Sequence, residues 1–177
     1  MNNGASRICQ SCGLCCNGVM FHSVRLQEAD VPQALVALGL RVRRKKGYQI
    51  IQQPCPAHKN SCCSIYLDRP QRCRLFECQQ LRRLAQGEIQ EIDALAKIRD
   101  VQERVARIEV LLLDAGTTDP RRPLSRRFEK IMAEPLHSYS DEKTFALHAD
   151  LTREMKELDS LLDEEFRIPT TQSTTID

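Results

Sequence analysis

The chain has 177 residues and a net charge of +2, with 28% charged and 41% hydrophobic residues. This size and balance predict one soluble globular unit or a compact core with an extension, and so small a charge gives no sign of a nucleic-acid or anionic-membrane partner. With no Trp, three Tyr and five Phe, the chain is also too poor in aromatic residues to form a base-stacking surface.

Membrane insertion and secretion are not expected either. No apolar run approaches the roughly 18 residues that a membrane span requires. The first ten residues, MNNGASRICQ, are polar and contain no apolar segment of the kind found in secretory signals. We therefore expect the protein in the reducing cytoplasm, where clustered cysteines bind metal or take part in redox chemistry more often than they form disulfides.

The first half of the chain predicts short elements joined by turns. Residues 7–18 indicate a tight loop, because Gly13 and Gly18 allow backbone conformations that other residues resist. Residues 19–26 fit a short strand, and residues 27–39 fit a helix that ends at a glycine.

A hairpin and a further helix are predicted before the last cysteine. Residues alternate in polarity on both sides of a KKG turn, which predicts a β-hairpin over about 40–53. Residues 54–63 are expected to form a polar loop. A helix then begins near Asp68, which suits an N-cap, has Pro70 in its first turn and extends to about Ala85.

The second half carries the periodic signal of long helices. Apolar residues spaced by threes and fours predict one helix over about 88–115 and another from about 141, with a short helix over 124–134 between them. Two such stripes joined by a short linker predict an antiparallel helical hairpin. The stripes pack against each other, or they offer a surface to a protein partner or a homodimer. Their members are Ile92, Leu95, Ile98, Val101, Val105, Ile108, Leu112, Leu147, Leu151, Met155, Leu158, Leu162 and Phe166.

Together these elements predict an α+β fold in three parts. All nine cysteines lie at or before position 78, within a small, irregular cysteine-cluster metal-binding domain over 1–85 that includes the β-hairpin. An α-helical hairpin extension of amphipathic antiparallel helices follows over 86–167, and the polar residues 168–177 are expected to form a disordered tail. The first part has few large apolar side chains, so it is expected to need a metal or disulfides to fold.

The stretch CQSCGLCC, residues 9–16, holds four cysteines in eight positions. A C-x2-C-x2-C spacing wraps three thiolates around one centre, as in ferredoxin-type loops, and a distant cysteine completes the site. Cys55, which precedes a proline, is one candidate for that ligand. Alternatively, Cys9 and Cys12 form half of a tetrahedral zinc site that Cys73 and Cys78 close. Eight cysteines would supply two four-thiolate centres, or one cluster with structural thiols beside it.

A second cysteine block, CPAHKNSCCSIYLDRPQRCRLFEC, covers residues 55–78. Together the two blocks resemble the CxxCxxCC family of zinc- or iron-chelating proteins, also called the YkgJ-type cysteine-cluster family. That family pairs C-x2-C-x2-C-C with a later C-P and then C-x-I-Y-x-x-R-P-x-x-C-R-x-F-x-C, and this chain matches the pattern over about residues 9–80. The resemblance implies that the following residues are metal ligands or near-ligands: Cys9, Cys12, Cys15, Cys16, Cys55, Cys63, Cys73 and Cys78.

The spacing favours an iron–sulfur cluster, with [4Fe–4S] preferred, in electron transfer or redox sensing. The alternative is a Zn²⁺ staple in a binding module whose helical half docks a protein partner. Cys62 lies outside the family pattern and is expected to be a spare thiol, and His58 is expected to be a solvated loop residue. Arg69 and Arg74 match the pattern and are expected to donate hydrogen bonds to the centre.

Whether the protein is an enzyme is left open by the sequence. The candidate acid–base groups of the first half are His22, His58, Asp68 and Glu77, and they form no recognised catalytic constellation. The chain therefore predicts a metal-binding protein without indicating a particular reaction.

Overall fold

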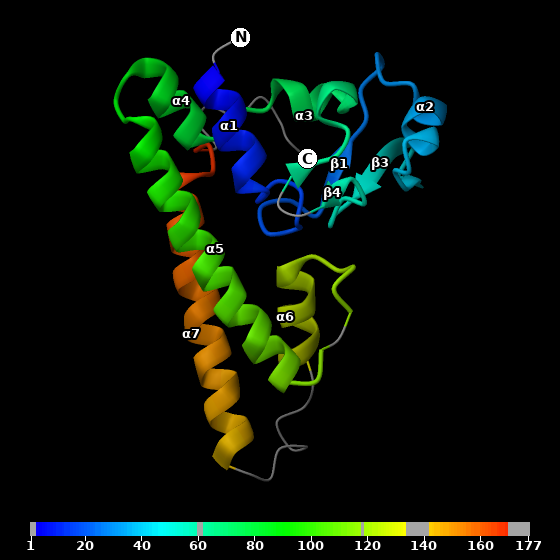
Figure 1. Ribbon diagram of the computed structural model, residues 1–177. Helices are drawn as coiled ribbons and strands as arrows, with labels where there is room; N and C mark the ends of the chain where they lie inside the picture. The colour runs from blue at the N-terminus through cyan, green and yellow to red at the C-terminus, as the bar shows by residue number, and fades with distance from the viewer. Residues whose placement is uncertain (1–2, 60–61, 118, 134–141, 170–177) are drawn as a thin grey trace.

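A computed structural model describes residues 3–59, 62–117, 119–133 and 142–169 (Figure 1). The α-helices are α1 Asn3–Cys12, α2 Pro32–Ala37, α3 Gln71–Leu75, α4 Gln79–Gln86, α5 Glu91–Asp114, α6 Leu124–Met132 and α7 Glu142–Glu165, with a 3-10 turn, η1, at Tyr66–Asp68. The strands are β1 Ser23–Arg25, β2 Val42–Lys45, β3 Tyr48–Gln52, β4 His58–Lys59 and β5 Cys62–Cys63. Short elements of the first half therefore precede long helices, which confirms the predicted α+β fold with a helical extension.

The predicted β-hairpin forms a three-stranded antiparallel sheet with β1, in the order β1-β3-β2. Its turn falls at Lys46 and Gly47, which both have positive φ (46° and 85°), as a two-residue type I′ turn requires. A second, two-stranded sheet pairs β4 with β5. The larger sheet and α2 share a small core with the loop after β3, and its buried members are Leu26, Leu35, Leu40, Ile51 and Ala57.

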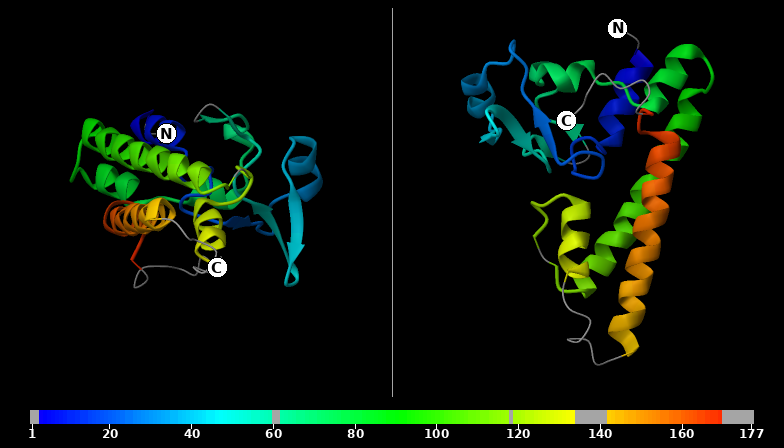
Figure 2. Two further views of the ribbon diagram at one scale, coloured as in Figure 1. Left: turned by 90° about the horizontal axis from the view of Figure 1, so that it is seen from below. Right: turned by 180° about the vertical axis from the view of Figure 1, so that it is seen from behind.

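The predicted helical hairpin is confirmed by α5 and α7, which lie side by side and run in opposite directions (Figures 1 and 2). Arg104 Nη1 lies 3.0 Å from Glu154 Oε2, and Lys97 Nζ lies 3.0 Å from Glu165 Oε1. The apolar stripe faces inward except at its start, where Ile92 is 67% exposed. None of the described helices combines the length and the apolar character that crossing a membrane demands. The buried stripe residues are Ile98, Val101, Ile108, Leu112, Leu151, Leu158, Leu162 and Phe166.

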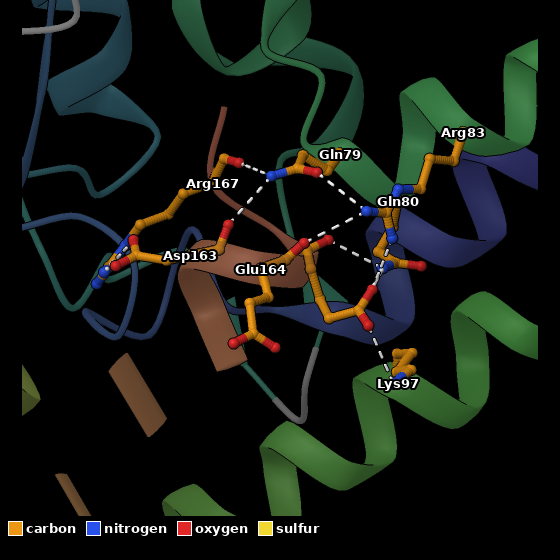
Figure 3. A network of polar contacts seen from close by, with 8 residues as sticks. Gln79, Gln80, Arg83, Lys97, Asp163, Glu164 and Arg167 are labelled. Carbon is orange, nitrogen blue, oxygen red and sulfur yellow. Dashed lines mark hydrogen bonds and ion pairs between the residues drawn. The ribbon is translucent and has the colours of Figure 1, made fainter. Parts of the chain in front are cut away.

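One continuous core connects the helical hairpin to the cysteine-rich region. Ile8 of α1 and Leu14 of the following turn are buried in the same cluster as Phe166, which follows α7. Polar contacts hold the same elements together, because the Glu165 carbonyl accepts a hydrogen bond from Gln80 Nε2 (2.9 Å) and the Glu165 carboxylate accepts one from Arg83 Nη1 (2.7 Å) (Figure 3). The start of α4 is therefore held against the end of α7, directly after the last cysteine.

The sequence predictions were wrong at several places in the first half. Residues 54–63, expected to form a polar loop, include the strands β4 and β5, and the helix expected over 27–39 is confined to 32–37. Residues 7–12 belong to α1 instead of a loop, and the helix expected from Asp68 to Ala85 is divided into η1, α3 and α4. Asp68 ends η1, and the first amide of α3, on Gln71, is capped by Asp30 Oδ1 at 2.7 Å. The tail expected over 168–177 lies outside the described residues from position 170 onward.

Truncation of a hairpin core residue is expected to destabilise the protein strongly. Leu158 is 2% exposed in the seam between α5 and α7. We expect Leu158→Ala to lower the free energy of unfolding by about 2–5 kcal/mol, because it removes buried methyl groups and leaves a cavity. Urea unfolding followed by circular dichroism measures this, with Leu113→Ala as the control because Leu113 is 58% exposed. Equal losses in the two variants would contradict the assigned packing.

Candidate metal centre

The cysteines gather around a cavity beneath α1. All nine are free thiols, and none takes part in a disulfide. The cavity has a volume of about 100 Å³, and its floor is apolar, with residues such as Phe21 and Phe76. Cys55 lies next to it, where its N–H donates to the Cys16 carbonyl at 2.7 Å. The cysteines that line the cavity are Cys9, Cys12, Cys15, Cys16, Cys63, Cys73 and Cys78.

The first cysteine block is a helix followed by a tight turn. Cys9 and Cys12 are three residues apart on α1, so both thiols lie on one helix face. The chain then turns at Gly13, which has a φ of 69° and whose carbonyl accepts the N–H of Cys16 at 2.8 Å. A Cβ atom at Gly13 would lie 2.5 Å from His58 Nε2. The glycine therefore provides both the left-handed backbone and the room for the second cysteine block.

The second block presents its cysteines from three elements. Pairing of β4 with β5 sets Cys63 opposite His58, and because successive strand residues face opposite sides, Cys62 points away. Cys62 is accordingly exposed, whereas Cys63 is half-buried and lines the cavity. Cys73 lies on α3, and Cys78 is the buried N-cap of α4. The expectation of a thiol outside the cluster at Cys62 is consistent with this exposure.

Burial keeps these thiols protonated in the absence of a cation. Burial raises the pKa of Cys12 and of Cys73 to about 12 and raises that of Cys15 well above its ordinary value, and neighbouring thiols add to each effect. Buried thiolates of one sign repel each other and have lost their water. A metal cation supplies the compensating charge and makes these groups strong ligands.

Arg69 places a positive charge beside the thiols. Its Nη1 lies 3.9 Å from Cys9 Sγ, and its guanidinium carbon lies 3.6 Å from the centre of the Tyr66 ring. Arg69 also lowers the pKa values of Cys63 and Cys73, against the larger effect of burial. The prediction that arginines donate hydrogen bonds to the centre is thus supported by geometry at Arg69. Arg74, in contrast, is exposed and does not line the cavity.

His58 is placed differently from the solvated loop position expected for it. Its ring lines the cavity against Gly13, it is half-buried, and its Nε2 atom is buried without a hydrogen-bond partner among the described residues. Burial lowers the pKa of His58, which favours the neutral ring. A buried ring nitrogen facing a group of thiols is the kind of polar atom that a bound inorganic centre would satisfy.

The donor set fits zinc or an iron–sulfur cluster. Thiolate is the soft ligand that both prefer, and none of the described cavity-lining residues is a carboxylate. Within the described stretches, no three Cys, His, Asp or Glu side chains already stand in the arrangement of a finished ion site. The sequence offers Cys55 or Cys78 as a ligand that completes the site of the first block. Cys78 packs with Cys12 and Cys15 against the main core, which is the one that contains Ile8 and Phe166, whereas Cys55 packs against the small core around Ile51.

The chain matches one known family. The family is CxxCxxCC, described as "Putative zinc- or iron-chelating domain", and the match covers residues 8–100. It therefore includes every cysteine, α4 and the first part of α5. No curated protein and no solved structure matches the chain significantly.

Proposed function

This chain belongs to the CxxCxxCC family, and on that premise we propose that its eight pattern cysteines hold one or more iron–sulfur clusters that carry electrons or sense redox state. Membership of a zinc- or iron-chelating family supports metal binding itself. The cluster type that we favour is [4Fe–4S], held by thiolate ligands alone. A reducing cytoplasm is the proposed location, because nine free thiols persist there.

The observation that carries this proposal is the size of the cavity that seven of the eight pattern cysteines line. A single Zn²⁺ ion draws four sulfurs directly around itself and leaves no cavity among them. Here the cavity of about 100 Å³ is several times the roughly 10–15 Å³ that one water-sized group needs. A polynuclear core of iron and sulfide would fill such a space, with Phe21 and Phe76 limiting its contact with water.

Arg69 supports a redox role because it places positive charge beside the thiols. Reduction adds negative charge to a cluster, and a nearby cation stabilises the reduced state. We expect Arg69→Gln to lower the reduction potential of the cluster while leaving its iron content intact. Redox titration followed by visible or EPR spectroscopy measures the shift. Arg74→Gln is the matched control, because Arg74 is exposed and does not line the cavity; equal shifts in the two variants would contradict the role of Arg69.

The direct test is anaerobic purification of the full chain, followed by analysis of iron, zinc and acid-labile sulfide and a visible spectrum. Iron and sulfide in equal amounts, with a brown charge-transfer band, would support the proposal. Colourless protein with stoichiometric zinc and no sulfide would overturn the iron–sulfur reading and leave the metal-binding family assignment standing.

A zinc-stapled binding module is the second candidate, and exposed apolar residues favour it. Val110 and Leu113 near the end of α5 and Phe145 near the start of α7 are 57%, 58% and 67% exposed. The end of α5 and the start of α7 form the end of the hairpin that is remote from α1 (Figure 1). In this reading the helical half docks a protein partner or a second copy of the chain. Zinc content without sulfide, together with self-association that Phe145→Glu abolishes, would support it.

A further inference from the structure

Four of the cysteines belong to the side of the cavity that faces the helical hairpin. Cys9 and Cys12 come from α1, Cys15 from the turn after it, and Cys78 from the start of α4, which packs against α1. Cys12, Cys15 and Cys78 all contact the main core.

The other four pattern cysteines belong to the side that faces the β1-β3-β2 sheet. Cys16 and Cys55 are joined by a backbone hydrogen bond of 2.7 Å, and Cys55 and Cys63 pack against the small core. Cys73 comes from α3, which contacts β1 of the same sheet.

The two groups meet at adjacent residues and at one arginine. Cys15 and Cys16 are consecutive, so their Cα atoms are about 3.8 Å apart while their thiols serve opposite sides. Arg69 lies between the groups, because its Nη1 is 3.9 Å from Cys9 Sγ and its side chain lines the same cavity as Cys63 and Cys73.

From this arrangement we propose that the chain holds two separate four-thiolate centres, one bound by Cys9, Cys12, Cys15 and Cys78 and the other by Cys16, Cys55, Cys63 and Cys73. The proposal rests on the proposed function insofar as a metal is bound, and it holds for either zinc or iron–sulfur centres. This arrangement explains why two cysteines stand side by side, because each of them binds a different centre. Cys15 and Cys16 connect the two centres through one peptide bond. This bond fixes the distance between the centres and joins the β1-β3-β2 sheet to the helical core.

Native mass spectrometry of the anaerobically purified full chain counts the centres directly. The expected result is two zinc ions or two clusters on each chain. One centre per chain would overturn the two-centre proposal and leave the proposed function intact. Absence of any bound metal would instead overturn the proposed function itself. This count uses the wild-type protein, so it does not depend on whether a variant folds.

Paired substitutions test which cysteines share a centre. Cys15→Ser and Cys16→Ser should each retain one centre, a two-fold drop in bound metal. Adding Cys78→Ser to Cys15→Ser should remove nothing further, because both residues bind the first centre. Adding Cys55→Ser to Cys15→Ser should remove the second centre as well. The partition is overturned if the two double variants retain equal metal, or if either single variant loses both centres while circular dichroism shows it to be folded.

Discussion

Removal of the bound metal is expected to unfold the β1-β3-β2 sheet, α2 and α3 while the α5–α7 hairpin stays helical. The small core has only five buried members, one of them Ala57, so it buries too little apolar surface to be stable alone. Binding of a structural metal can contribute about 10–16 kcal/mol, and that free energy is folding free energy where the site does not exist in the unfolded chain. The hairpin keeps its own seam of aliphatic side chains and its ion pairs.

Limited trypsin digestion with mass mapping, before and after chelation or cluster disassembly, measures this effect. New cleavages are expected between Arg25 and Arg74, in the strands and short helices that the metal would hold in place, and circular dichroism should retain most of its helical signal. Reconstitution with the native metal is the control and should restore protection. Equal protease resistance with and without metal would show that the thiols do not support this half of the fold.

The long helices and the β-hairpin could be predicted from the sequence, because their apolar or turn residues occur at the spacing that their structure requires. The stripes of α5 and α7 lie within a few residues of their predicted bounds, since each buried position repeats at helical spacing. The KKG turn likewise identified the β2–β3 hairpin, because the turn residues must adopt positive φ. The cysteine pattern similarly identified the family, since thiols at those spacings have few other uses.

The first half could not be predicted in detail because its local structure is set by distant contacts. Pro70 lies directly before α3 and was a local signal for a helix start, but Asp30, which caps α3, lies 41 positions from Gln71 and could not be identified from the local sequence. Residues 7–12 have little helical character of their own, yet α1 forms because Ile8 is buried against the hairpin. The position of His58 beside Gly13 likewise depends on the approach of two blocks that are far apart in sequence.

Substitution of Cys63 is expected to remove a metal centre, whereas the same substitution one residue earlier is expected to have almost no effect. Cys63 lines the cavity opposite His58 in the β4–β5 pair, and Cys62 is paired with Lys59 and faces outward. Serine is nearly the same size as cysteine but is a much poorer ligand for soft metals. We therefore expect Cys63→Ser to lose about half of the bound metal and to become sensitive to protease in the β1-β3-β2 sheet.

The neighbouring variant makes the comparison specific. Cys62→Ser changes the same atom in the same short strand, so it should share any general effect of losing a thiol, while keeping its metal because the side chain at position 62 is exposed. Metal analysis and tryptic half-life of the two variants, purified in parallel, provide the measurement. If Cys62→Ser lost as much metal as Cys63→Ser, the register of β4 with β5 would be wrong by one residue, since a shift of one exchanges the two faces of a strand.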